Sequence, residues 1–194
     1  MGIDMNELRR YRDEINQRKK QAVWAPPNED ECVISYMRMP PGSLGFGLCE
    51  GIPFSYYRQK HKSKEQPKLR KGTMNYLRLV RRNGNLLRVD KYVHGRIDVV
   101  HLAQYSDGVR YLFPFRDGGG FYPTYTYVTH RDNDRPSMEF WVDGGQILRW
   151  TYDYREDGSI SAAYINAVPD GSVPILSRGT DVFIPGEEIA LLIT

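Results

Sequence analysis

The chain lacks the features of an exported or membrane-embedded protein. Its 194 residues include 2 cysteines, Cys32 and Cys49, whose spacing fits no metal site and predicts no disulfide framework in a domain of this size. The N-terminus has no apolar signal-peptide core, and no later stretch reaches the length of a membrane span. These absences predict a cytoplasmic protein, in a reducing compartment, that has no membrane partner.

Catalytic signatures are also missing. No Gly-x-Ser-x-Gly elbow occurs, and the glycine-rich stretch from Gly42 to Gly51 lacks the Lys-Ser/Thr of a phosphate loop. None of the histidines has a metal-type spacing to another ligand; they are His61, His94, His101 and His130. The sequence therefore predicts no catalytic residue, no metal ligand and no cofactor, and it favours a protein that is not an enzyme.

The composition is that of an ordinary globular protein, with 40% hydrophobic and 26% charged residues. Its length fits a single domain spanning residues 1–194. The net charge of +3 does not by itself indicate nucleic-acid binding, because that affinity comes from clustered cations. The 14 tyrosines favour a sheet, since tyrosine has a high strand propensity.

In the N-terminal region, residues 1–25, the segment from Asp4 to about Ala22 predicts a helix. Asp4 and Glu7 form a capping-box-like start, and an apolar face recurs at Leu8, Tyr11 and Ile15. We expect Pro26-Pro27 to end this helix. The opposite face is cationic and is expected to be solvated; its residues are Arg9, Arg10, Arg12, Arg18, Lys19 and Lys20.

Residues 32–73 predict one strand, from Cys32 to Met39, followed by a glycine-rich and then a basic loop. The basic segment runs from Arg58 to Lys71 and contains one acid, Glu65. It suits a solvated loop, a docking patch for an acidic protein, or a contact to a phosphate backbone. The residues predicted here to bind a partner are Arg58, Lys60, Lys62, Lys64, Lys68 and Arg70.

Residues 74–194 predict an antiparallel β-meander. Turn signals such as Asn83-Gly84, Asp107-Gly108 and Asp157-Gly158 recur at intervals that leave room for strands of about eight to ten residues. The fold class is therefore mainly β, or α+β, with one N-terminal helix in front of the meander.

Alternation within the strands predicts one packed face and one wetter face, with the helix covering part of the packed one. Trp150 shares its predicted face with Leu148, and this face is expected to be the packed one. Trp141 alternates out of phase with Phe140, so it is expected on the wetter face. Trp141 and the nearby Tyr122 are therefore predicted as partner-binding aromatic residues.

The stretch from Asn83 to Gly108, NGNLLRVDKYVHGRIDVVHLAQYSDG, resembles the MORN-like hairpin repeats of a group of bacterial antitoxin and immunity proteins. The stretch WTYDYREDGSI, from Trp150 to Ile160, resembles a YD repeat. The resemblance implies a β-hairpin architecture and a protein that blocks a toxin by occluding its active site. The partner expected on this basis is another protein, with nucleic acid as the weaker alternative.

One enzymatic alternative remains. The segment from Arg178 to Pro185 resembles the last catalytic strand of ADP-ribosyltransferases, in which Glu-x-Glu precedes an aliphatic run. In this chain the two glutamate positions are Gly179 and Asp181. A plain edge strand accounts for the same residues.

Overall fold

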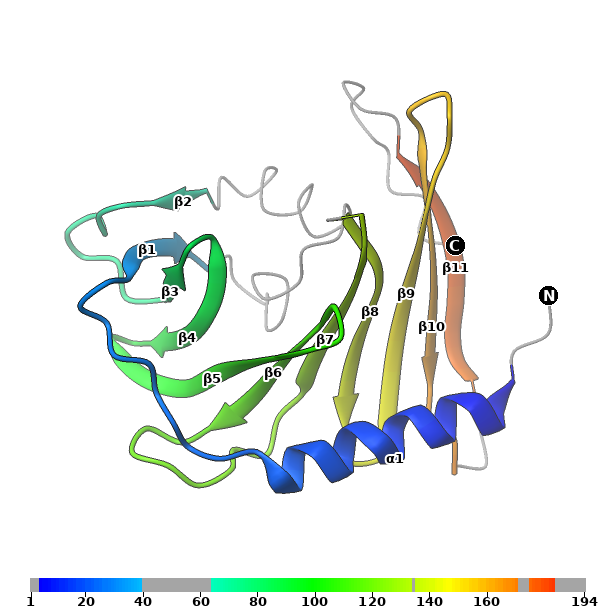
Figure 1. The fold of residues 1–194 in the computed structure, drawn as a ribbon, viewed down its shortest axis with the longest axis horizontal. Coiled ribbons are helices and arrows are strands. Elements are labelled where there is room, and N and C mark those ends of the chain that lie inside the picture. Colours follow the sequence, from blue (N-terminus) through cyan, green and yellow to red (C-terminus); the bar gives the residue numbers. More distant parts are fainter. Residues whose placement is uncertain (1–3, 40–63, 134, 171–174, 184–194) are drawn as a thin grey trace. The chain divides into compact units, whose positions relative to one another are not determined.

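The computed structural model describes residues 4–39, 64–133, 135–170 and 175–183. These residues form one helix and eleven strands. Strands β3 to β6 and strands β7 to β11 each lie side by side in chain order, whereas β1 lies between β3 and β2. This arrangement confirms the predicted mainly β meander with one N-terminal helix (Figure 1). No helix in this described part has the length and apolarity needed to cross a membrane. The chain divides into two compact units, and the expectation of a single domain stays a prediction.

The first unit, Val23–Thr124, is called the tyrosine unit. Its strands are β1 (Val33–Arg38), β2 (Glu65–Gln66), β3 (Tyr76–Arg82), β4 (Asn85–Val93), β5 (Arg96–Ser106) and β6 (Val109–Phe115). They are antiparallel in the order β6-β5-β4-β3-β1-β2, so the predicted strand at Cys32–Met39 belongs to the meander as β1. Strand β2 lies inside the segment that was predicted to be a basic loop.

Tight hairpin turns connect β3 to β6 at the predicted positions. Both central residues of each turn have positive φ angles, for example 50° at Asn83 and 81° at Gly84. The same holds at His94-Gly95 and Asp107-Gly108. Two consecutive positive φ angles define the type I′ turn, whose twist matches that of the strands it joins.

The second unit, Met1–Ala22 with Tyr125–Thr194, is called the helix unit. Its strands are β7 (Thr126–Asp132), β8 (Arg135–Asp143), β9 (Gln146–Tyr154), β10 (Ile160–Ala167) and β11 (Ile175–Phe183). They pair with their neighbours in chain order, all antiparallel. Asp157-Gly158, another predicted turn, joins β9 to β10, with φ of 83° at Gly158.

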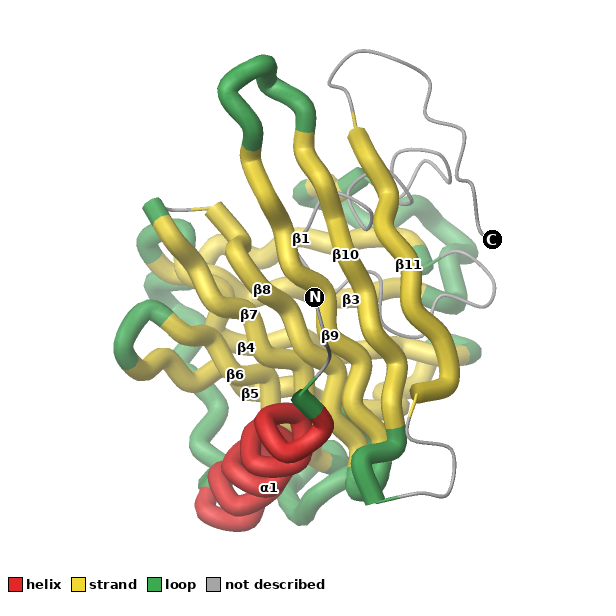
Figure 2. Tube along the Cα trace, turned by 90° about the vertical axis from the view of Figure 1, so that its right-hand side faces the viewer, coloured by secondary structure: helices red, strands yellow, loops and turns green. Residues whose placement is uncertain are grey.

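Helix α1 (Met5–Gln21) lies across one end of these strands (Figures 1 and 2). The Asp4 side chain caps it by accepting hydrogen bonds from the backbone N–H groups of Asn6 and Glu7 at 2.9 and 3.2 Å. Leu8 and Ile15, each 1% exposed, bury the predicted apolar face. Burial of that face against the sheet stabilises a helix of this length far more than its own propensity does.

The helix ends at Gln21, within one residue of the predicted end near Ala22, and Ala22 is already extended with φ of −66° and ψ of 138°. The chain therefore leaves the helix before it reaches Pro26-Pro27. One expectation about the helix is wrong. The cationic face is not solvated throughout, since Arg12 is 7% exposed and forms ion pairs with Asp13 and Asp170. Arg9 also reaches Asp170, at 2.7 Å, so the loop after β10 holds the first half of the helix.

The strand register overturns the expected placement of the two tryptophans. On β8 and β9, Trp141 is paired with Leu148 and Glu139 with Trp150, so both tryptophans lie on one face of the sheet. The helix packs on the opposite face, where the Tyr11 ring stacks on Phe140 at 4.2 Å. The alternation within each strand was predicted correctly, but it does not say which face the helix covers. Because both tryptophans lie on the same face, the prediction that Trp150 is packed on one face and Trp141 lies on a wetter opposite face is wrong.

Below the helix, burial lowers the pKa of His130, and the Tyr11 hydroxyl is hydrogen-bonded to its Nε2. The folded state therefore binds this proton less readily than the unfolded chain, in which the pKa is about 6.5. We expect the free energy of unfolding to be unaffected by His130 above about pH 6.5, where the ring is neutral in both states. Below this pH it should fall as the pH drops towards the lowered pKa of the folded state, because the unfolded chain binds the proton more readily.

Urea unfolding of the wild type and of His130→Gln at pH 7.5 and pH 5.5 checks this expectation. The wild type should lose more stability between the two pH values than the variant does, because the variant lacks the titrating ring. Equal losses in both proteins would show that other groups cause the pH dependence.

Candidate functional site

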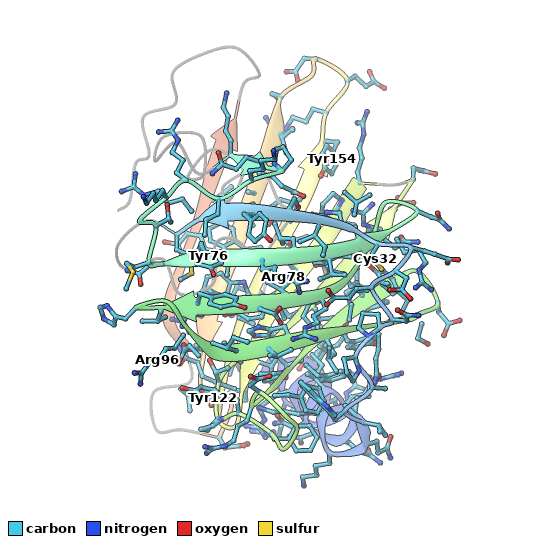
Figure 3. The ribbon with its side chains drawn as sticks, turned by 90° about the vertical axis from the view of Figure 1, so that its left-hand side faces the viewer. Cys32, Tyr76, Arg78, Arg96, Tyr122 and Tyr154 are labelled. Carbon is cyan, nitrogen blue, oxygen red and sulfur yellow. The ribbon has the colours of Figure 1, made fainter. Side chains whose placement is uncertain are left out.

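The sheet of the tyrosine unit has two different faces. One face is apolar, with Leu79 and Val89 opposite each other and at most 1% exposed. The other face, called the tyrosine face, carries Tyr36, Tyr76 and Tyr92 together with charged residues. Figure 3 looks at this side of the unit and labels Tyr76 and Arg78 on β3.

Three tyrosines from three strands form a row on the tyrosine face. Tyr76 is paired with Tyr92 on β4, and their rings stack at 4.4 Å with an interplanar angle of 11°. Tyr36 on β1 meets Tyr76 edge-on at 6.1 Å. The rings are partly exposed, and none of the three hydroxyls forms a hydrogen bond within the described residues.

A network of four charges adjoins this row. Arg78 lies directly opposite Tyr36 on one side and Asp90 on the other. Asp90, whose side chain is 1% exposed, accepts hydrogen bonds from Arg78 at 3.0 Å and from Arg88 at 2.6 Å. Glu29 contacts both arginines, with a hydrogen bond from Arg78 Nη1 at 3.0 Å and an ion pair to Arg88 at 3.8 Å.

The network is balanced, since two guanidinium groups face two carboxylates. The hydrogen bond from Arg78, its charge and that of Arg88 hold the pKa of Glu29 below its usual value despite partial burial. Glu29 in turn raises the pKa of Arg78. Burial raises the pKa of Tyr76 and Tyr92, so both remain protonated and able to donate hydrogen bonds.

Glu29 belongs to a segment without regular secondary structure, Val23–Glu31, which is called the strap. The strap leads from α1 to β1 (Figure 1). Trp24 packs edge-on against Phe115 at 5.6 Å, and the Asn28 carbonyl accepts a hydrogen bond from Arg82 at 2.7 Å. Pro26-Pro27, expected to end the helix, lies in the middle of the strap.

The alternation of polar and apolar residues along β4 predicts that Asp90 faces solvent, yet its side chain is 1% exposed. The strap lies over this part of the tyrosine face and explains the burial. Gly119, in the turn after β6, lies against the Trp24 ring, and its φ of 108° favours glycine at this position. The strap therefore covers the arginine part of the tyrosine face. Within the described part of the chain, its charged contact to the sheet comes from the Glu29 side chain.

Exposed cations lie on β1 and around β2, at one edge of the sheet. Arg38 on β1 is paired with Tyr76 and is exposed. Gln66 on β2 is paired with Tyr36, and Lys64 comes two residues before Gln66. Arg38, Lys64, Lys68 and Arg70 are all exposed, and none forms an ion pair with a described carboxylate.

Of the predicted partner-binding residues, the structure places Lys64, Lys68 and Arg70 on the tyrosine unit, around β2. Arg58, Lys60 and Lys62 lie outside the described residues. Tyr122 also belongs to this unit, but its hydroxyl donates to Asp98 at 3.1 Å, which raises its pKa. Trp141 belongs to the helix unit, where it packs against Tyr127 at 5.6 Å.

Sequence reasoning missed the three tyrosines and the arginine network. One signal was present: β1 and β3 both contain the pattern Tyr-apolar-Arg, at Tyr36-Met37-Arg38 and Tyr76-Leu77-Arg78. Alternation puts the tyrosine and arginine of each pattern on one face. Only the register between the strands brings the two patterns side by side.

Residues Arg178 to Phe183 of the segment that resembles an ADP-ribosyltransferase strand lie in β11, and Ile184 and Pro185 lie outside the described residues. Gly179, at the first glutamate position of that pattern, is paired with Tyr164 on β10. A Cβ atom on Gly179 would lie 2.5 Å from the Tyr164 ring, so no side chain fits there while the ring keeps this position. Among the described residues, no group of three or more His, Cys, Asp or Glu side chains could hold a metal ion.

Comparison with known proteins adds no further identification: no protein family, no curated protein and no solved structure matches this chain significantly.

Proposed function

We propose that this chain is a non-catalytic protein that binds an acidic protein partner through the tyrosine face. The observation that carries the proposal is the row of three tyrosines, whose hydroxyls form no hydrogen bond to another described residue. Exposed cations on β1 and around β2 also have no carboxylate partner among the described residues. Tyrosine supplies large contact area with little loss of side-chain entropy, and its hydroxyl bonds to polar groups of a partner. The cations accelerate the encounter with an acidic surface.

The ring geometry favours a protein over nucleic acid. Bases bind by stacking on open aromatic faces. The faces of Tyr76 and Tyr92 are directed at each other, since the rings are nearly parallel at 4.4 Å. Stacking covers one face of each of these rings, and Tyr36 also contacts Tyr76, so less ring face is left for a base. The ring edges and hydroxyl groups suit the polar groups of a protein.

The resemblance of the β4–β5 hairpin region to MORN-like repeats supports a narrower proposal. In this proposal the partner is a toxin and the chain is an immunity or antitoxin protein that occludes the toxin's active site. The toxin surface that contacts the tyrosine face is then acidic.

Fluorescence polarisation with a labelled peptide of ten glutamates tests the proposed chemistry. Two variants address the two parts of the surface: Tyr76→Phe/Tyr92→Phe removes the hydroxyls and keeps the stacked rings, and Lys64→Ser/Lys68→Ser/Arg70→Ser removes exposed charge. We expect the charge variant to weaken binding about tenfold at low salt, with less effect at high salt. The hydroxyl variant should weaken binding at both salt concentrations.

A matched control removes three cations from the helix unit, Arg10→Ser/Lys20→Ser/Arg155→Ser. It should leave the affinity within about twofold, and neither triple variant should change the melting temperature much, because exposed charges contribute little to folding. Equal losses in both triple variants, or no loss in the hydroxyl variant, would contradict the proposed surface. Tighter binding of a labelled ten-nucleotide oligothymidine that is lost in the tyrosine variant would favour nucleic acid instead.

A further inference from the structure

We propose that Glu29 occupies the place of a partner carboxylate on Arg78 and Arg88, and that the bound partner displaces the strap. This inference rests on the proposed function, because it assigns a regulatory contact to the same surface. The strap then acts as an internal competitor for the tyrosine face.

The first argument is the difference between the two carboxylates of the network. The Asp90 side chain is 1% exposed and lies on the sheet between the two arginines, so it cannot leave without unfolding β4. The Glu29 side chain is 31% exposed and comes from outside the sheet. Removing Glu29 leaves two guanidinium groups with one buried carboxylate, a net charge of about +1 that a carboxylate from solution would neutralise.

The second argument is position. Arg78 is the direct cross-strand neighbour of Tyr36 and shares its face of β3 with Tyr76. A protein surface that rests on the row of tyrosines therefore lies next to the Glu29 carboxylate. The guanidinium group forms paired hydrogen bonds with any carboxylate that replaces it, so the incoming group reproduces the contact that is lost.

The third argument is the weak attachment of the strap. Residues Ala22 to Glu29 have no regular secondary structure, and Val23 is 68% exposed. Among the described residues, the hydrogen bonds and ring contacts that join the strap to the sheet, besides those of Glu29, are the Trp24–Phe115 ring contact and the Arg82 bond to the Asn28 carbonyl. Loss of the Glu29 ion pairs removes the ionic contact between the strap and the sheet. The other two contacts involve different strap residues, Trp24 and Asn28, so each can break separately.

The same ten-glutamate peptide and the full chain provide the test. Glu29→Gln keeps the shape of the side chain and removes its charge. If the strap is seated nine-tenths of the time, this variant should bind the peptide about tenfold more tightly than the wild type. Glu31→Gln is the matched control, because Glu31 lies in the same strap, is exposed and forms no ion pair in the described structure. It should change the affinity by less than about twofold.

Hydrogen exchange on the wild type is the second measurement, and it does not depend on a variant that folds. Adding the peptide should increase amide exchange in Val23–Glu31 and decrease it at Tyr76–Arg82. Protection of β3 with unchanged exchange in the strap, or equal gains in affinity for the two glutamine variants, would overturn the inference while the proposed function stands. Absence of peptide binding to the wild type and to Glu29→Gln would overturn both.

Discussion

Replacing Asp90 by asparagine is expected to lower the free energy of unfolding by about 3 kcal/mol. Removal of one partner from a buried ion pair costs about 3–5 kcal/mol, because the remaining charge is left uncompensated in a poorly solvated site. Asp90 is bonded to both Arg78 and Arg88, and all three side chains are less than one-fifth exposed. The effect lies at the lower end of the range because Glu29 still contacts both arginines.

Urea unfolding at pH 7 measures this loss, and Asp98→Asn is the control. Asp98 also forms an ion pair, with Lys91 at 2.6 Å, but the Asp98 side chain is 29% exposed whereas that of Asp90 is 1% exposed. Its replacement should cost less, about 1 kcal/mol, since solvent reaches the Asp98 carboxylate and screens its charge. Equal losses in the two variants would show that the burial of Asp90 adds nothing to the contribution of its ion pairs.

Phe140→Ala is expected to lower the free energy of unfolding by about 3–5 kcal/mol, the range for deletion of a buried phenylalanine side chain. Phe140 is 2% exposed. Its ring stacks on Tyr11 of α1 at 4.2 Å and meets His130 edge-on at 5.7 Å. The deletion leaves a cavity between the helix and the sheet, so amide exchange in Met5–Gln21 should increase together with the loss of stability.

Two milder variants separate the contribution of the Phe140–Tyr11 ring contact from that of the Tyr11–His130 hydrogen bond. Phe140→Leu nearly conserves the volume and should cost less than about 1.5 kcal/mol. Tyr11→Phe keeps the stacked ring and removes the hydroxyl that bonds to His130, which should cost about 1 kcal/mol. If Phe140→Ala cost no more than Phe140→Leu, the helix would not depend on the packing of this ring.

Local chemistry made much of the fold predictable. Asp4 was identified as the start of a helix because a carboxylate can accept hydrogen bonds from the free N–H groups of the first turn. The turns at Asn83-Gly84 and Asp107-Gly108 were predicted because asparagine, aspartate and glycine tolerate positive φ angles. Each of these preferences acts over a few neighbouring residues, so the printed order of residues is enough to reveal it.

The sequence names only some residues of the candidate site, and their role stays a prediction. Lys64, Lys68 and Arg70 were predicted because a run of cations is visible in the sequence. Tyr36, Tyr76 and Tyr92 were not, because they are far apart along the chain and come together through the pairing of β1, β3 and β4. Alternation assigns residues to the two faces of a single strand, but pairing decides which residues of different strands are neighbours.

The sequence alone thus determined the elements of this protein: one capped helix, a succession of strands and the tight turns between them. The tertiary structure decided which face of each sheet is covered and by what. In the helix unit, Trp141 and Trp150 lie on one face of the strands, and α1 packs against Phe140 on the other. In the tyrosine unit, Glu29 of the strap contacts Arg78 and Arg88. The reason is that turns and caps are local interactions, whereas burial depends on segments distant in sequence that compete to cover the same surface.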